Sequence, residues 1–219
     1  MLAGMLTAYA EAPLRESYNL NRDWRFYFTD APDAADADYV TLPHTWNVDD
    51  GEGGYLRTTA NYIRELNIPK EWEGKRLFMR FGGAQSVAEL FVNGNYVGEH
   101  RGGFTAFTIE ITDYLRYGTD NHLRVVVSNS MRSDVLPLST DVNLAGGIYR
   151  DVELLVTQKE IISPLYYGTE GVIVEQHKVT REQALGVVKV YLSPKSIDHS
   201  TVTMRMVGED GYEVLNRTV

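Results

Sequence analysis

The chain is constrained most strongly by an alternation of apolar and polar residues that recurs along most of its length. From residue 24 onward, short runs carry an apolar side chain at every second position and are separated by turn residues. A spacing of two places these side chains on one face of a β-strand, whereas a helix face needs a spacing of three or four, so the sequence predicts an all-β chain. The apolar positions of the first runs are Trp24, Phe26 and Phe28; Tyr62, Leu66 and Ile68; Leu77, Met79 and Phe81; Ala88, Leu90 and Val92; Phe107, Ile109 and Ile111; Leu123, Val125 and Val127; and Val152, Leu154 and Val156.

One turn is specified by its residues alone. Asn93-Gly94 stands between the apolar runs Leu90–Val92 and Tyr96–Val97. Both positions of a two-residue hairpin turn need a positive φ, which Asn and Gly adopt most easily. Many short strands joined by Gly-rich turns, with a helical turn expected only around 113–117, predict a two-sheet sandwich or jelly roll.

A second domain is predicted after the first series of strands. The alternation breaks at Pro164 and Gly168 and then resumes. An immunoglobulin-like sandwich uses about seven strands, and the remaining residues supply only about four, so this domain looks partial. We therefore divide the chain into 1–16, 17–158 as a jelly-roll domain, and 159–219 as a truncated immunoglobulin-like domain. Unpaired strand edges in the last part would invite either pairing with another copy, which would give a homo-oligomer, or simple disorder of this segment. The apolar positions of these strands are Val172 and Val174; Val188, Val190 and Leu192; Val202, Met204 and Met206; and Val214.

Composition argues against several classes of partner. The chain has 30 acidic and 21 basic residues, a net charge of −9 that repels nucleic-acid phosphates. It contains no cysteine, which excludes a thiolate zinc site, and no apolar run near the roughly 20 residues of a membrane-spanning helix. The start, MLAGMLTAYA, ends in small residues as a secretory signal does but lacks the basic beginning. We expect residues 1–16 to be a signal-peptide remnant or a disordered N-terminus, and the protein to be exported to the periplasm or outside the cell.

No recognisable catalytic pattern occurs. The GxSxG, HExxH, P-loop and GxGxxG patterns are all missing. His44 stands beside a proline with no second ligand at metal spacing, which favours a structural hydrogen bond over metal binding. The two long connections, Thr41–Ala60 and Ser133–Gly147, are the segments where function is expected, the alternative being irregular covers over the ends of a sandwich.

Five segments in a fixed order resemble one known family. They are LNRDWRF (20–26), TLPHTWN (41–47), NYIRELNIPKEWEGKRLFMRFGGA (61–84), LFVNGNYVGEHRGGFTAF (90–107) and GGIYRDVELL (146–155). Together they resemble the N-terminal sugar-binding domain of glycoside hydrolase family 2, the β-galactosidase and β-glucuronidase family. The resemblance covers nearly all of residues 17–157.

The resemblance implies a jelly roll, an immunoglobulin-like domain and then a (β/α)8 barrel that carries both catalytic glutamates. Glycoside hydrolysis uses a pair of carboxylates, and none can be nominated here. We therefore expect this chain to be the non-catalytic front portion of a retaining, β-galactosidase-like enzyme, sharing a carbohydrate substrate with the barrel. The alternatives are a free-standing carbohydrate-binding module and a purely structural sandwich.

The resemblance also nominates substrate-binding residues. The aspartate of the family's YRD motif, here Asp151, reaches into the barrel's pocket to contact the sugar and, in some members, a cation. A carboxylate suits this task because its two oxygens accept from adjacent hydroxyls; the alternative is that Asp151 pairs with Arg150 or caps the turn after Gly147. Arg57 or Asp49 would provide a second contact, although the family's usual asparagine is not evident there. No cofactor is expected in this chain, and a monovalent or magnesium ion belongs to the full-length enzyme.

The three tryptophans have two readings, because indole rings stack on sugars but also fill cores. Trp24 alternates with two phenylalanines and is predicted to lie in the core. Trp72 is predicted to pack in a turn, and Trp46, at the start of a long loop, fits either role.

Overall fold

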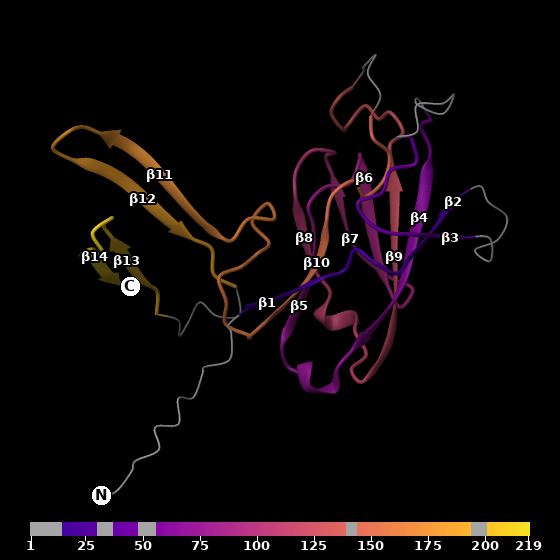
Figure 1. The fold of residues 1–219 in the computed structure, drawn as a ribbon, viewed down its shortest axis with the longest axis horizontal. Coiled ribbons are helices and arrows are strands. Elements are labelled where there is room, and N and C mark those ends of the chain that lie inside the picture. The colour runs from indigo at the N-terminus through magenta and orange to yellow at the C-terminus, as the bar shows by residue number, and fades with distance from the viewer. Residues whose placement is uncertain (1–14, 30–36, 48–55, 139–143, 194–200) are drawn as a thin grey trace, which may run out of the picture. The chain divides into compact units, whose positions relative to one another are not determined.

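The computed structural model describes residues 15–29, 37–47, 56–138, 144–193 and 201–219. The chain divides into two compact units, which are considered separately (Figure 1). The first comprises Met1–Gln158 together with Pro164–Thr169, and the second Lys159–Ser163 together with Glu170–Val219. The segment Pro164–Thr169, which the sequence assigned to the second domain, thus groups with the first unit.

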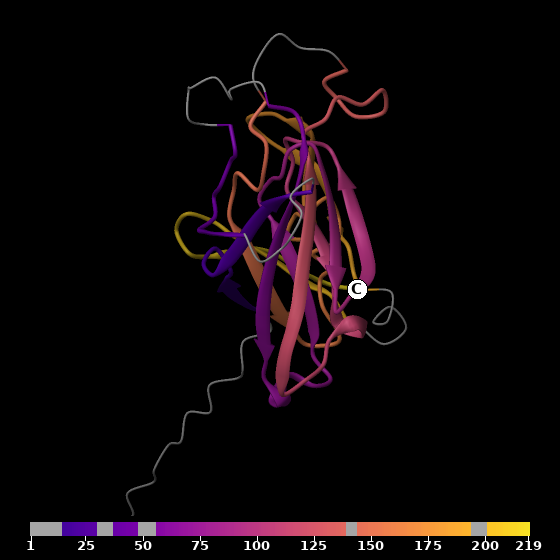
Figure 2. The ribbon, with the colours of Figure 1, turned by 90° about the vertical axis from the view of Figure 1, so that its right-hand side faces the viewer.

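The first unit is a sandwich of two antiparallel sheets that face each other (Figures 1 and 2), so the predicted all-β sandwich is confirmed. Two short 3-10 helices, η2 (Lys70–Trp72) and η3 (Thr112–Tyr114), lie between strands. The four-stranded sheet has the order β1 (Arg15–Asn19), β10 (Val152–Thr157), β5 (Arg76–Phe81) and β8 (Phe107–Glu110). The six-stranded sheet has the order β3 (Asp38–Val40), β2 (Trp24–Phe28), β4 (Thr59–Ile68), β9 (Thr119–Ser128), β6 (Val87–Val92) and β7 (Asn95–Arg101).

The core lies between the two sheets and is built from the alternating positions that the sequence indicated. Leu77, Met79 and Phe81 of β5 are fully buried against the six-stranded sheet's inner residues. Trp24 is also fully buried, as predicted, and its Nε1 donates to the Leu20 carbonyl at 2.6 Å. Each large apolar side chain that is buried stabilises the fold by about 1.5–3 kcal/mol, so this core holds the two sheets together.

The local sequence predicted one turn of the first unit but not two of its edge strands. Asn93 and Gly94 join β6 to β7 with φ of 51° and 82°, which confirms the predicted hairpin. Strands β1 and β3 carry no apolar alternation and were not predicted, because each lies at a sheet edge with most side chains exposed. Strand β1 begins at Arg15, ahead of residue 17, and pairs with β10.

The second unit contains two hairpins among its described residues. Strands β11 (Val172–Val179) and β12 (Ala184–Val190) form one, and β13 (Thr203–Val207) and β14 (Glu213–Thr218) form the other. All four coincide with predicted strands. Apolar side chains such as Val174, 66% exposed, and Met206, 51% exposed, remain uncovered because each ribbon has only two strands.

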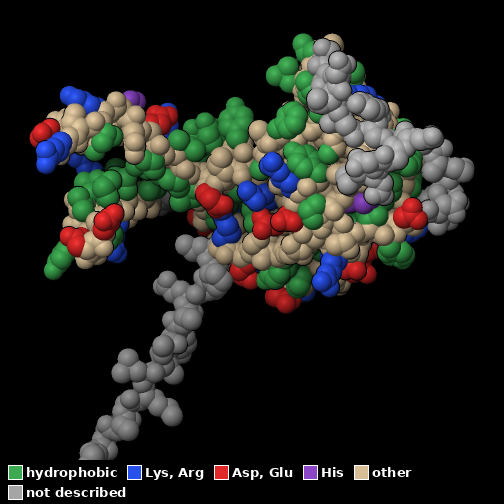
Figure 3. All heavy atoms as spheres, turned by 45° about the horizontal axis from the view of Figure 1, so that its top comes forward, with side chains coloured by type: hydrophobic (Ala, Val, Ile, Leu, Met, Phe, Trp, Pro, Cys, Tyr) green, Lys and Arg blue, Asp and Glu red, His purple; other side chains and the backbone are tan. Residues whose placement is uncertain are grey.

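The surface carries both signs of charge. Acidic and basic side chains are interspersed on the face shown in Figure 3. Among the described residues, no helix is long and apolar enough to cross a membrane.

Candidate functional site

The ends of several strands meet at one end of the sandwich, the upper end in Figure 1. We call this region the loop end; it comprises residues 42–47, 56–58, 82–86, 128–130 and 144–151. Backbone hydrogen bonds tie these segments together across both sheets. They are Gly82 N to Asp151 O at 2.8 Å, Gln85 N to Gly147 O at 3.0 Å, Ser86 N to Ser128 O at 2.6 Å, Asn129 N to Thr58 O at 3.1 Å, His44 N to Ile148 O at 2.8 Å and Trp46 N to Gly146 O at 3.0 Å.

Two buried asparagines anchor the long connections to this end. Asn129 is 1% exposed; its Oδ1 accepts from Thr58 N at 2.8 Å and its Nδ2 donates to Leu56 O at 2.9 Å. Asn47 Nδ2 donates to Leu144 O at 2.7 Å, and its Oδ1 accepts from Gly146 N at 2.8 Å. Each side-chain amide therefore bonds to backbone N–H and C=O groups of the loops, which have no strand partner. A backbone group that was buried there without a hydrogen bond would destabilise the fold by about 1–3 kcal/mol.

The paired glycines of the GGIYRD segment allow the two long connections to approach closely. A Cβ on Gly146 would lie 2.2 Å from the Trp46 indole. Gly147 has a φ of +126°, and a Cβ there would lie 2.5 Å from the Tyr62 hydroxyl. Only glycine fits these positions, which is the physical reason for the motif's double glycine. The fully buried Ile148 that follows fixes the chain just before the candidate residue Asp151.

Asp151 lies immediately before β10 with its side chain exposed. Its Oδ1 accepts a hydrogen bond from Asn21 Nδ2 at 2.8 Å. Asn21 Oδ1 in turn accepts from Val152 N at 2.9 Å, which fixes the amide with its nitrogen toward the carboxylate. Within the described part of the chain, Oδ2 of Asp151 carries no hydrogen bond. One carboxylate oxygen is thus held, and the other is open to a ligand.

Within the described residues, Arg150 forms no ion pair with Asp151. The Arg150 guanidinium donates to Gly82 O at 3.4 Å and lies 5.3 Å from the centre of the Tyr149 ring. The Tyr149 hydroxyl donates to the Gly103 carbonyl, which ties the β7–β8 connection to the YRD segment. The side chain bonded to Asp151 is an amide, which neither neutralises the carboxylate nor forms a catalytic carboxylate pair.

His44 has the structural role that the sequence favoured. Its Nδ1 is 2.8 Å from the Tyr62 hydroxyl, and its ring packs 4.8 Å from that of Phe26. Burial lowers the pKa of His44 and raises the pKa of Tyr62. Both side chains are therefore neutral near pH 7 and form an uncharged support beneath the loop end.

The other nominated residues are placed as follows. Arg57 is partly buried, and its Nη1 donates to Asn129 O at 3.3 Å. No hydrogen bond or ion pair within the described residues joins it to Asp151. Asp49 lies outside the described residues. Among those described, no cluster of three or more His, Asp or Glu side chains could hold a metal ion.

The remaining tryptophans are used for packing. Trp46 packs against Phe28 with ring centres 6.1 Å apart, and its Nε1 donates to Leu56 O at 3.3 Å. Trp72 lies in η2 with its ring 5.1 Å from that of Tyr18, so it packs at a turn as predicted.

Known proteins share the part of the chain that contains the loop end. The family model described as glycosyl hydrolases family 2, sugar binding domain, matches residues 37–158. The chain belongs to glycoside hydrolase family 2. The matched region is the family's sugar-binding domain and not its catalytic barrel. This match confirms the resemblance seen in the sequence.

Relatives of this family 2 chain carry two activity names. A Bacteroides fragilis protein named beta-glucuronidase is 43% identical over 204 residues, which are 92% of this chain and 29% of that protein. A beta-galactosidase of Thermoanaerobacter pseudethanolicus is 28% identical over 210 residues, 90% of this chain and 27% of that protein. The crystal structure of Bacteroides uniformis beta-glucuronidase superposes with a TM-score of 0.83 at 30% identity, covering 94% of this chain and 26% of that one. The chain thus spans less than a third of the length of each of these relatives.

Proposed function

We propose that this chain forms the non-catalytic, sugar-contacting side of a retaining family 2 glycosidase that hydrolyses terminal β-linked sugars. The catalytic carboxylates belong to another domain of the whole protein, and Asp151 helps to position the substrate beside them. Family membership supports the reaction class. The names of the relatives point to β-glucuronides and β-galactosides as the substrates to test.

The observation that carries this proposal is the asymmetric hydrogen bonding of Asp151. Asn21 orients the carboxylate through Oδ1, so little side-chain freedom remains to be lost when a sugar binds. The open Oδ2 can accept from a sugar hydroxyl, and a hydrogen bond to a charged group is about twice as strong as one between neutral groups. An exposed carboxylate that is held on one side only is suited to binding and positioning. Cleavage would require a second carboxylate at its side.

The test compares Asp151→Ala and Asp151→Asn in the complete protein, expressed from its whole reading frame. Loss of a charge-assisted hydrogen bond worth about 1.5–3 kcal/mol should lower kcat/KM by about tenfold to a hundredfold with nitrophenyl β-galactoside or β-glucuronide. Asp113→Asn, an exposed aspartate in η3 far from the loop end, serves as the matched control and should leave kcat/KM unchanged. Unchanged kcat/KM in both Asp151 variants would contradict the proposal.

A further inference from the structure

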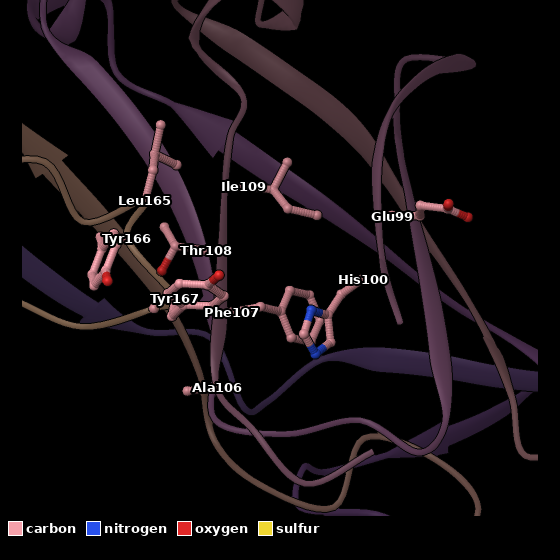
Figure 4. A pocket seen from close by; sticks show the side chains of 10 residues that line it. Glu99, His100, Ala106, Phe107, Thr108, Ile109, Leu165, Tyr166 and Tyr167 are labelled. Carbon is pink, nitrogen blue, oxygen red and sulfur yellow. The ribbon is translucent and has the colours of Figure 1, made fainter. Parts of the chain in front are cut away.

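A cavity of about 250 Å³ opens at the side of the first unit. It lies where β7, the edge strand of the six-stranded sheet, approaches β8, the edge strand of the four-stranded sheet. The segment 165–168 forms the remaining wall (Figure 4). All of its lining residues belong to the first unit, and none of them belongs to the loop end.

The wall formed by residues 165–168 is held in place before any ligand arrives. Arg80 Nε donates to Gly168 O at 3.3 Å, and Thr169 N donates to Tyr166 O at 3.0 Å. Gly168 has a φ of +64°, and a Cβ there would lie 2.8 Å from the carbonyl of Ala106. The segment therefore packs directly on the start of β8 through a glycine, and the cavity is a preformed feature of the fold.

Four of the residues that line the cavity have aromatic rings, namely His100, Phe107, Tyr166 and Tyr167. Phe81 and Phe107 are stacked with centres 4.7 Å apart, and His100 stacks on Phe107 at 4.2 Å. This column of rings ends in the cavity at His100 (Figure 4). Tyr167, 78% exposed, lies on the opposite wall beside Tyr166. Flat aromatic surfaces of this kind suit a ligand that presents an apolar ring face.

One polar atom in the wall has no partner. Thr108 Oγ1 is buried and forms no hydrogen bond. An unsatisfied buried hydroxyl costs about 1–3 kcal/mol, so it is rarely retained without a use. Thr108 is one of the residues that line the cavity (Figure 4). A ligand hydroxyl in the cavity can supply the partner that this oxygen lacks.

The charges around the cavity select against an anion. None of the residues that line it, all of them described, is Lys or Arg. The neighbouring Arg80 already donates to Gly168 O and, at 3.1 Å, to Glu153. Burial lowers the pKa of His100, which leaves the ring neutral near pH 7. A carboxylate entering this cavity would lose hydration without gaining a cationic partner.

We propose that this cavity is an accessory carbohydrate site that binds one neutral pyranose ring, separately from the sugar contact at Asp151. The apolar face of the pyranose packs against the aromatic walls, and a sugar hydroxyl bonds to Thr108. The volume is below the roughly 300–1,000 Å³ of sites for drug-sized ligands, which limits the occupant to a single ring. The inference rests on the proposed function only for the choice of carbohydrate as the ligand.

The test titrates the ¹⁵N-labelled 219-residue chain with methyl β-galactopyranoside and methyl β-glucuronide and follows the amide signals of Thr108, Tyr167 and Gly168. The neutral glycoside should give saturable shifts with a Kd in the millimolar range, and the glucuronide should bind at least several times more weakly. Thr108→Val removes the hydroxyl at nearly constant shape. It should raise Kd about threefold to tenfold while leaving Tm unchanged or higher, because no protein hydrogen bond is lost.

Tyr167→Ala provides a second variant that tests the aromatic wall without threatening the fold, because the ring is largely exposed. It too should raise Kd, whereas Asp151→Ala should leave Kd unchanged. The proposal is overturned by an absence of shifts at these amides, by equal binding of the glucuronide, by a lower Tm in Thr108→Val, or by shifts that vanish in Asp151→Ala. Full activity of the Asp151 variants in the complete protein would overturn only the proposed function and leave this site in place.

Discussion

Asn21 is the residue that makes Asp151 a defined feature of the structure. Its amide links the carboxylate to the backbone of Val152, and its own carbonyl accepts from Leu42 N at 2.8 Å. Asn21, which precedes β2, is thus hydrogen-bonded through its side chain to the start of β10 and through its backbone to Leu42, which follows β3. An isolated polar residue leaves no periodic signal, so only its place in the LNRDWRF motif could have pointed to it.

Asn21→Asp separates the positioning role of this residue from its structural one. The new carboxylate can still accept from Val152 N, but it cannot donate to Asp151 and repels it instead. In the complete protein we expect KM to rise and kcat/KM to fall about tenfold, because the Asp151 carboxylate is no longer oriented through its Oδ1. Circular dichroism should show that the fold is retained.

The chain offers a matched control for this substitution. Asn67 Nδ2 donates to Asp120 Oδ1 at 2.9 Å at the other end of β4, on the surface. Asn67→Asp creates the same like-charge pair away from the site and should leave KM and kcat unchanged. Equal kinetic losses in both variants would mean that added negative charge, and not the orientation of Asp151, explains the effect.

At the scale of the elements, apolar alternation was sufficient to predict the strands that build the core. β2, β4, β5, β6, β8, β9 and β10 all coincide with predicted runs, because burial on one face imposes the period. The loop end could be predicted only in part. The family motif pointed to Asp151, but the contacts made by Asn47 and Asn129 join positions far apart in sequence and depend on tertiary geometry.

The double glycine before Asp151 gives a prediction at this scale. Gly147→Ala places a Cβ at a φ of +126°, 2.5 Å from the Tyr62 hydroxyl and 2.6 Å from His44 O. We expect the free energy of unfolding to fall by about 2–4 kcal/mol, from backbone strain and displaced neighbours together. Urea unfolding followed by tryptophan fluorescence measures this, because the three tryptophans, Trp24, Trp46 and Trp72, all lie in the first unit.

Gly74→Ala is the matched control, since Gly74 also has a positive φ, +88°, but nothing lies within 4 Å of its added Cβ. This control should cost only about 1 kcal/mol of backbone strain. A loss in Gly147→Ala no larger than that in Gly74→Ala would show that the close approach of the long connections contributes little.

At the scale of the whole molecule, the first unit presents the oriented carboxylate of Asp151 at the loop end of a two-sheet sandwich. The chain corresponds to only 26–29% of the length of its beta-glucuronidase and beta-galactosidase relatives. In the proposed enzyme, Asp151 would form one side of a sugar site whose catalytic side lies in another domain. In that arrangement, Asp151 contacts one sugar hydroxyl directly.

A double-mutant cycle between the side chain of Asp151 and the hydroxyls of the substrate measures this contact. The complete protein and its Asp151→Ala variant are assayed with the parent nitrophenyl glycoside and with its deoxy analogues, each lacking one hydroxyl. If Asp151 bonds to a particular hydroxyl, the substitution should lower kcat/KM for the parent substrate but have almost no effect for the analogue lacking that hydroxyl. The same fractional loss for every analogue would contradict a direct contact between Asp151 and the sugar.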